Sequence, residues 1–238
     1  MEQQVIFMQQ KLCRTFVAAF PHTIPIFAGY VFLGMSYGIL MKTSGFPFWY
    51  PILTSLTVYA GSMEFVTVNL LLGAFDPFQA VSMALMLNAR HLFYGISMLE
   101  TYKGTGWKKL YLIFGLSDET FSVNCAIEPP LGIDRSWFYF LITILDQSYW
   151  VLGAALGGIF GSFFPFSTKG LDFVMTALFV VIFLEHMLSG KDRSSTWIGL
   201  GLSLVALLVF GANGFLIPAM LMILGALLLL PKKEEAAA

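Results

Sequence analysis

Ionisable side chains lie inside the longest apolar stretches of this sequence, where charge is expensive. A charged residue at the centre of a bilayer costs about 2.5–3.5 kcal/mol on insertion scales. Six such residues would together cost on the order of 15–20 kcal/mol, which exceeds a typical folding stability of about 5–15 kcal/mol. They must therefore pair, take up protons or line a wet cavity. The six are Glu64, Arg90, Asp118, Glu119, Asp146 and Glu185, and His22, His91 and His186 lie beside them.

Arg90 is the basic residue among these six. A guanidinium does not lose its proton in a protein, so Arg90 needs an anion, either one of the carboxylates or a bound ligand. Five carboxylates against one arginine is an imbalance. Some of these carboxyl groups must hold a proton or reach water.

Arg90 belongs to the stretch LMLNARHLFYG, residues 85–95, which is otherwise typical of a buried helix. On a regular helix, Asn88 and His91 share one face. Arg90 and Tyr94 share roughly the opposite face. Polar groups on both sides indicate either a centrally buried helix or a local break.

Two eight-residue segments carry a similar acidic pattern, with Ser, Glu, Thr or Ser, Val and Asn in register. On a helix, Glu64 and Glu119 would each share a face with the hydroxyl residue three positions later, while Ser62 and Ser117 would point away. Transporters are often built from repeats visible only as weak internal similarity. The segments, residues 62–69 (SMEFVTVN) and 117–124 (SDETFSVN), thus raise the possibility of an internal repeat, and chance similarity is the alternative.

The composition indicates that lipid is the main solvent of this chain. Of its 238 residues, 58% are hydrophobic and 11% are charged, whereas a soluble domain carries roughly 25% charged residues. The net charge of −1 provides no field to attract nucleic acid. The two cysteines are far apart, and no HExxH, Walker A or GxSxG motif is present, so no metal or other cofactor is expected.

The elements that must position these side chains are helices, since period-2 alternation is absent and the apolar runs approach the roughly 20 residues of a membrane span. We predict an all-α integral membrane protein, a polytopic bundle of about seven to eight transmembrane helical elements, some broken or re-entrant. Residues 1–231 would form a single transmembrane domain and 232–238 a short charged tail. The candidate spans lie near 16–41, 51–75, 78–99, 110–127, 137–160, 173–188, 196–212 and 216–230.

Basic residues leave the topology open. Under the positive-inside rule, the basic residues near both ends of the chain would face the cytoplasm, which requires an even number of spans. Eight full spans would place Lys103, Lys108 and Lys109 outside. A broken or re-entrant segment around 78–99 would move these three lysines inside.

Small residues at helical spacing predict close helix packing. Gly34 and Gly38, and likewise Gly153 and Gly157, are four residues apart within apolar runs. Glycines at this spacing let two helix backbones approach closely.

Four blocks of the sequence resemble the AzlC family of branched-chain amino-acid exporters. Beyond residue 125 the likeness is looser. The blocks occur in the family's order, and this chain has Glu64 where the family commonly has Gln. They are PIFAGYVFLGMSYG (25–38), VYAGSMEF (58–65), LNARHLFYG (87–95) and FGLSDETF (114–121).

The resemblance implies a large permease subunit that exports leucine, isoleucine, valine or their analogues. It would work with a small AzlD-type membrane subunit in the bacterial or archaeal cell (inner) membrane, as a multi-pass protein in the lipid bilayer. A higher oligomer is left open. Arg90, or the start of a half-helix near it, would bind the carboxylate of the substrate. An acidic residue would bind its ammonium group. One carboxylate would couple proton uptake to export. The candidate transport residues are Gly61, Ser62, Glu64, Asn88, Arg90, His91, Tyr94, Asp118, Glu119 and Asp146.

Three other interpretations stay open. A cation channel or ion transporter could use the same acidic cluster for a cation. A structural subunit would use Arg90 only to hold helices together. An intramembrane enzyme with His91 as acid or base fits least, because the sequence offers no recognisable nucleophile.

Overall fold

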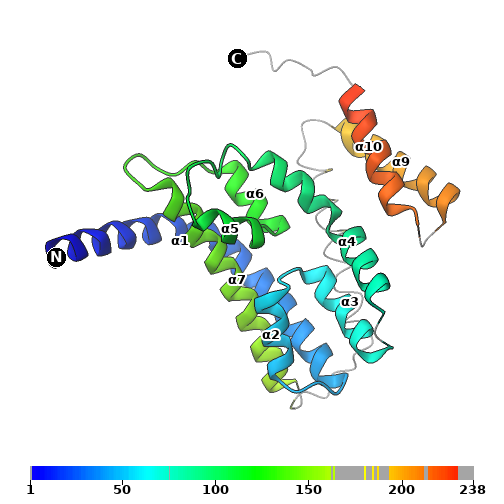
Figure 1. Cartoon of the computed structure of the whole chain (residues 1–238), viewed down its shortest axis with the longest axis horizontal. Coiled ribbons are helices and arrows are strands. Elements are labelled where there is room, and N and C mark those ends of the chain that lie inside the picture. Colours follow the sequence, from blue (N-terminus) through cyan, green and yellow to red (C-terminus); the bar gives the residue numbers. More distant parts are fainter. Residues whose placement is uncertain are drawn as a thin grey trace. The chain divides into compact units, whose positions relative to one another are not determined.

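The computed structural model describes two compact units, which are taken separately (Figure 1). Every regular element in the described ranges is an α-helix, so the predicted all-helical class is confirmed for this part of the chain. Most of the candidate span 173–188, including Glu185 and His186, and the predicted tail at 232–238 lie outside the described residues. The units are residues 1–175 and 176–238, and the described residues are 2–74, 76–161, 163, 180, 184, 187, 193–211 and 214–229.

Two long helices, α1 (Glu2–Thr43) and α7 (Arg135–Phe160), lie side by side in the first unit (Figure 1). Among the described residues, these two helices are long and apolar enough to cross a membrane. They run parallel, because Lys11 binds Asp134 near one end and Gly38 meets Gly157 near the other.

Glycine is required at the crossing of α1 and α7. A Cβ added to Gly38 would collide with the backbone carbonyl of Ala154, and one added to Gly157 would collide with that of Met35. Gly34 and Gly153 lie in the same contact. The predicted close packing through small residues is therefore confirmed.

The predicted span at 51–75 is two short helices, α2 (Trp49–Thr57) and α3 (Gly61–Leu72). The chain turns back between them, because the Ser55 hydroxyl donates a hydrogen bond of 2.9 Å to Glu64. Tyr59 sits in this turn with a φ of 43°. Few non-glycine residues adopt a positive φ, and a bulky residue in that region is strained. We call residues 49–72 the first hairpin.

The next helix, α4 (Pro77–Ser97), is continuous. A break of the helix within these residues, one of the two alternatives raised for 78–99, is therefore wrong. The interior of α4 holds no proline, and the polar side chains of its last turns find partners on a neighbouring helix instead of interrupting their own backbone.

The predicted span at 110–127 is also divided, into α5 (Lys108–Phe114) and α6 (Asp118–Ala126). Asn124 Nδ2 donates a hydrogen bond of 2.9 Å to the Tyr102 hydroxyl, so the end of α6 returns to the level at which the chain entered α5. Ser117 starts α6 by accepting a hydrogen bond from the Thr120 amide at 3.1 Å. We call residues 108–126 the second hairpin.

The two hairpins enter the first unit from opposite ends. The first follows the end of α1 at Thr43. The second follows the end where α7 begins, since Lys108 Nζ donates to Ser136 Oγ at 3.1 Å. Their turns meet, with the rings of Tyr59 and Phe114 6.3 Å apart. The two segments with the similar acidic pattern, 62–69 and 117–124, begin within one residue of the starts of α3 and α6. They therefore occupy similar places in two similar hairpins.

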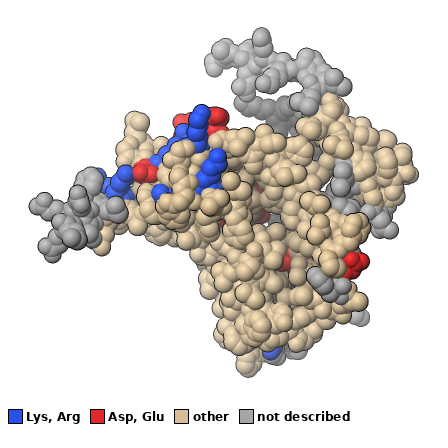
Figure 2. Space-filling view, viewed as in Figure 1, with Lys and Arg blue, Asp and Glu red and all other residues tan. Residues whose placement is uncertain are grey.

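The apolar core of the first unit lies between α1, the second hairpin and α7. It is built around the fully buried side chains of Ala19, Leu112, Phe138 and Ile142. Lysine and arginine side chains gather at the end of this unit where α1 and α7 begin, and Lys42 lies in the last turn of α1 (Figure 2).

The second unit contains α9 (Arg193–Phe210) and α10 (Leu216–Leu229), which pack against each other. These helices confirm the elements predicted at 196–212 and 216–230. Gly211, with a φ of 71°, ends α9 in a conformation that favours glycine.

Candidate functional site

The first turn of α6 lies where the two hairpins meet, and it carries three of the residues that form the candidate site. Ser117 caps this turn, and Asp118, Glu119 and Thr120 follow it. Backbone N–H groups at a helix start carry partial positive charge, which favours acidic side chains there. The sequence thus places its acidic pair at a helix start that faces the centre of the unit.

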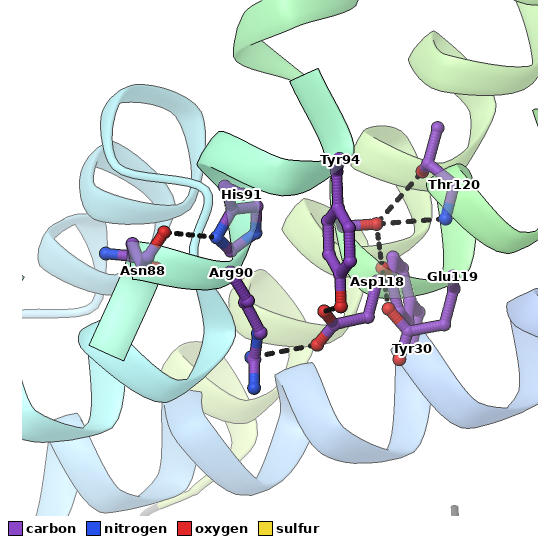
Figure 3. A network of polar contacts seen from close by, with 9 residues as sticks. Tyr30, Asn88, Arg90, His91, Tyr94, Asp118, Glu119 and Thr120 are labelled. Atoms are coloured by element: carbon purple, nitrogen blue, oxygen red, sulfur yellow. Dashed lines mark hydrogen bonds and ion pairs between the residues drawn. The ribbon is translucent and has the colours of Figure 1, made fainter. Parts of the chain in front are cut away.

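Arg90 and Tyr94 of α4 both bind Asp118 (Figure 3). Arg90 Nη2 lies 2.8 Å from Asp118 Oδ2, and the Tyr94 hydroxyl donates to Asp118 Oδ1 at 2.8 Å. The shared face predicted for Arg90 and Tyr94 is confirmed by this common partner. The side chains of Arg90 and Asp118 are 31% and 26% exposed, so the ion pair is within reach of water or a ligand.

A second set of contacts runs from Glu119 to Asp146 of α7 through three hydroxyl groups. The Tyr30 hydroxyl of α1 lies 2.6 Å from both Glu119 Oε2 and Ser117 Oγ. Ser117 Oγ lies 3.0 Å from Thr120 Oγ1, which lies 2.8 Å from Asp146 Oδ2. Asp146 is fully buried. Its partners, and those of Glu119, are hydroxyl groups rather than cations.

One sequence prediction about these acidic residues is wrong. Ser117 does not point away from the carboxylates, because it precedes α6 and its hydroxyl turns inward to Tyr30 and Thr120. Glu119 is held by Tyr30 of a different helix rather than by Ser122 of its own. Helical spacing does not apply to Ser117, because α6 begins only at Asp118 and Ser117 is in an extended conformation.

Glu64 lies in a separate, fully buried position on α3. Trp150 Nε1 lies 3.0 and 3.1 Å from its two carboxylate oxygens, and Ser55 donates to it at 2.9 Å. Thr67, the hydroxyl residue three positions later, donates to the Met63 carbonyl of its own helix.

Gly61 and Ser62 lie at the start of α3, beside this position. A Cβ on Gly61 would lie 3.0 Å from the Trp150 ring, so the glycine leaves room for the indole that reaches Glu64. Ser62 is half-buried in the first turn of α3.

Asn88 and His91 lie on the other side of α4 from the Asp118 contacts (Figure 3). His91 Nδ1 is 3.2 Å from the Asn88 carbonyl of its own helix. The Asn88 side-chain oxygen is buried without a hydrogen-bond partner among the described residues. Asn88 is therefore not brought into the Asp118 cluster, whereas His91 borders it, with its ring centroid 5.5 Å from that of Tyr94.

Sequence reasoning missed Tyr30, Tyr59 and Trp150. Nothing in their local sequence separates them from other aromatic residues of membrane helices. The buried Tyr59 hydroxyl lies beside Thr120 and close enough to Asp146 and Glu119 for their charges to act on it. Ser117 could have been found, because Ser followed by two acidic residues is a typical helix start.

No group of three or more His, Cys, Asp or Glu side chains in the described part of the chain could hold a metal ion. The arrangement at the hairpin turns instead offers an ion pair beside a set of hydrogen-bonded carboxyl and hydroxyl groups. Such groups can bind a small charged molecule or hold a proton.

The profile of one protein family, described as "AzlC protein", matches residues 25–164. The chain belongs to the AzlC family. The matched region of this AzlC chain contains both hairpins, Tyr30, Arg90, Asp146 and Trp150. The family resemblance noted in the sequence is therefore confirmed.

Relatives of this AzlC chain include the "Branched-chain amino acid transport protein AzlC" of Bacillus subtilis (strain 168), which is 57% identical over 96% of this chain and 90% of its own length. An "Uncharacterized membrane protein" of Haemophilus influenzae is 48% identical over 86% of this chain and 84% of its own length. The "Inner membrane protein YgaZ" of Escherichia coli (strain K12) is 26% identical over 71% of this chain and 72% of its own length. No solved structure matches the chain.

Proposed function

We propose that this chain is the large subunit of a two-component permease that exports branched-chain amino acids across the cytoplasmic membrane, coupled to proton movement. The Bacillus subtilis relative is named for branched-chain amino acid transport and is 57% identical over nearly the whole chain, which supports the same substrate class. The observation that carries the proposal is the partly exposed ion pair of Arg90 and Asp118 where the hairpins meet.

An amino acid is a zwitterion, and both of its charges are expensive to remove from water. Arg90 presents a planar fork of donors suited to a carboxylate. Asp118 presents oxygens suited to an ammonium group. These two side chains lie 2.8 Å apart. An amino acid that separates them replaces one ion pair with two and leaves the net charge of the site unchanged.

Aromatic rings beside the ion pair offer a surface for an aliphatic side chain. The rings of Tyr94 and Phe121 stack with centroids 4.3 Å apart and planes inclined by 10°. Tyr94 also donates to Asp118, so the stacked pair adjoins the charged groups. Burying each methylene of a leucine or valine against such a surface is worth about 0.8 kcal/mol.

The proposal is tested by counterflow of labelled leucine in proteoliposomes that contain the purified chain, with and without its small partner. We expect stereoselective exchange that falls by a factor of about 10–100 in Arg90→Ala, because a hydrogen bond to a charged group is worth about 1.5–3 kcal/mol. Arg14→Ala is the matched control, because Arg14 is exposed and lies near the start of α1. Absence of exchange from folded protein, with the partner present, would refute the proposal.

A small AzlD-type membrane subunit is the proposed partner. We expect exchange only from preparations in which both proteins are expressed together, and co-purification of the two through an affinity tag on one of them. Exchange of equal rate from the large chain alone would show that the partner is dispensable. A higher oligomer would appear as a larger mass of the detergent-free complex.

The proposed setting is the inner membrane, with the seven to eight helical elements at membrane depth. The name of the Escherichia coli relative supports this location. The basic end of the first unit, where Lys11 and Lys108 lie near the start of α7, would face the cytoplasm under the positive-inside rule. This orientation requires that α2 and α3 re-enter from the opposite side.

A second candidate within transport is a cation channel or ion transporter. It is favoured by Glu64, Glu119 and Asp146, whose hydrogen-bond partners in the described ranges are hydroxyl and indole groups. This candidate predicts current across a planar bilayer in the absence of amino acid. The permease proposal predicts no such current. Neither candidate involves an enzymatic reaction.

A further inference from the structure

Two carboxyl groups, those of Glu119 and Asp146, are joined end to end by hydroxyl groups from three residues. The contacts run from Glu119 to Tyr30, from Tyr30 to Ser117, from Ser117 to Thr120, and from Thr120 to Asp146. Their lengths are 2.6, 2.6, 3.0 and 2.8 Å. All four lie in the range of hydrogen bonds between oxygen atoms.

Each of these contacts needs one proton, and the three hydroxyl groups supply only three. A hydroxyl donates once, whereas an ionised carboxylate can only accept. With both carboxylates ionised, Tyr30 donates to Glu119 and Thr120 donates to Asp146. Ser117 can then donate to Tyr30 or to Thr120, so one of these two contacts would join oxygens with no proton between them.

A single additional proton satisfies all four contacts. When it is on Asp146, every hydroxyl donates toward Glu119, and when it is on Glu119, every hydroxyl donates toward Asp146. The two arrangements differ by the transfer of one proton along each of four hydrogen bonds. No bond other than O–H forms or breaks, and the total charge is the same before and after.

We propose that Glu119 and Asp146 share one proton through a relay of Tyr30, Ser117 and Thr120. The proton rests on Asp146, which is fully buried, and whose second oxygen has no hydrogen-bond partner in the described ranges. An unsatisfied oxygen is tolerated far better on a neutral acid than on a buried carboxylate. The proton leaves by way of Glu119, which is only half-buried.

The groups around the relay favour this resting position. Tyr59 and Tyr111 lie near enough to interact with Asp146, and they bring no positive charge to stabilise its ionised form. Arg90 and Asp118 lie beside Glu119, and the Arg90 charge favours ionised Glu119 while that of Asp118 opposes it. The ion pair proposed to bind the amino acid therefore adjoins the outlet of the relay. Coupling of the proton to amino-acid export rests on the proposed function, whereas the sharing of the proton does not.

The test is infrared difference spectroscopy of the purified full-length chain during a pH titration, which detects protonated carboxyl groups directly. We expect one carboxylic-acid band that is removed by Glu119→Gln and equally by Asp146→Asn. Either amide brings an N–H donor that takes the place of the shared proton. Two bands, each lost only in its own variant, would overturn the proposal, as would the absence of any band assignable to these residues.

A third change tests the relay without altering a carboxyl group. Ser117→Ala leaves two separate hydrogen bonds that need no additional proton, so the titration midpoint of the band should fall by roughly half a pH unit to one pH unit, the worth of one hydrogen bond. Ser117 also caps α6, so Ser117→Thr, which keeps both roles, is the control and should restore the midpoint. Tyr30→Phe interrupts the relay without touching the cap, so the carboxylic-acid band should then depend on one carboxyl group alone and persist in one of the two amide variants.

An unchanged midpoint in Ser117→Ala, or a band that both amide changes still remove in Tyr30→Phe, with melting temperatures like that of the wild type, would contradict the relay. The spectroscopy needs no transport activity, so its outcome is separate from that of the counterflow experiment. Proton uptake measured in the same liposomes then connects the two. If Ser117→Ala still exchanges leucine but no longer moves protons, the permease proposal stands. The relay then serves to couple proton movement to transport.

Discussion

Ser55 donates a hydrogen bond of 2.9 Å to Glu64, which lies nine residues further along the chain. On a continuous helix these residues would be about 13 Å apart along the axis, since each residue rises 1.5 Å. The bond exists because the chain folds back at Tyr59. The second hairpin also turns back, because Asn124 near the end of α6 binds Tyr102, which precedes α5. Each fold brings a helix start toward the centre of the unit.

The fold of the first hairpin should depend on an acceptor at position 64 rather than on its charge. Glu64→Gln keeps an oxygen for Trp150 Nε1 or Ser55 and should leave the free energy of unfolding nearly unchanged. Glu64→Ala leaves two buried donors without an acceptor, at about 1–3 kcal/mol each. Thermal unfolding followed by tryptophan fluorescence measures the difference, with Glu100→Ala as an exposed control. Equal loss in the Gln and Ala variants would show that the charge itself matters.

The crossing of α1 and α7 should not tolerate even one methyl group. Gly38→Ala places a Cβ against the Ala154 carbonyl, and overpacking of this kind costs about 1–3 kcal/mol or more. Gly29→Ala, in the same helix, is the matched control, because a Cβ there meets nothing within 4 Å. The yield of monodisperse protein and its melting temperature in detergent should fall only in Gly38→Ala. A similar loss in both variants would point to helix flexibility rather than packing.

The contact between Lys11 and Asp134 should give a small stabilisation that disappears in acid. The Lys11 ammonium, 2.8 Å away, holds the pKa of Asp134 below its ordinary value of 3.8. A lowered carboxyl pKa adds stability above that ordinary value, and the stability is lost as the pH falls through the lowered pKa. Because Lys11 is 48% exposed, the gain is at most about 1 kcal/mol.

This prediction is checked by comparing the melting temperatures of the wild type and Lys11→Met at neutral pH and in acid. The difference should shrink in acid and also in high salt, which screens exposed charges. Lys103→Met is the control, because Lys103 contacts Glu100 on a more exposed surface. A difference that stays constant with pH would assign the effect to packing of the lysine stem.

The orientation of the first unit can be read with single cysteines. In a chain that lacks Cys13 and Cys125, we expect Lys103→Cys to react with an impermeant maleimide only from the cytoplasmic side. Ser44→Cys, which follows the other end of α1, should react only from outside. Reaction of both cysteines from the same side would contradict the opposed entry of the two hairpins.

Some features of this fold follow from local sequence patterns, and others do not. Glycines four residues apart predicted the packing of α1 on α7, because backbone proximity depends on the absence of a side chain and is visible in the sequence. The similarity between segments 62–69 and 117–124 indicated that two parts of the chain form similar elements. Neither pattern predicted that each element bends back on itself, since an apolar run of span length fits a straight helix or a hairpin equally well.

The sequence by itself determined the helical class, the need to satisfy acidic groups within apolar runs, and the shared face of Arg90 and Tyr94. These follow from composition and from helical periodicity, which are local properties. Only the tertiary structure decided that Asp118 is the partner of Arg90, and that Tyr30 joins Glu119 to the route toward Asp146. The partners come from helices far apart in the chain, and their meeting depends on where two hairpins turn, a property of packing that no single segment encodes.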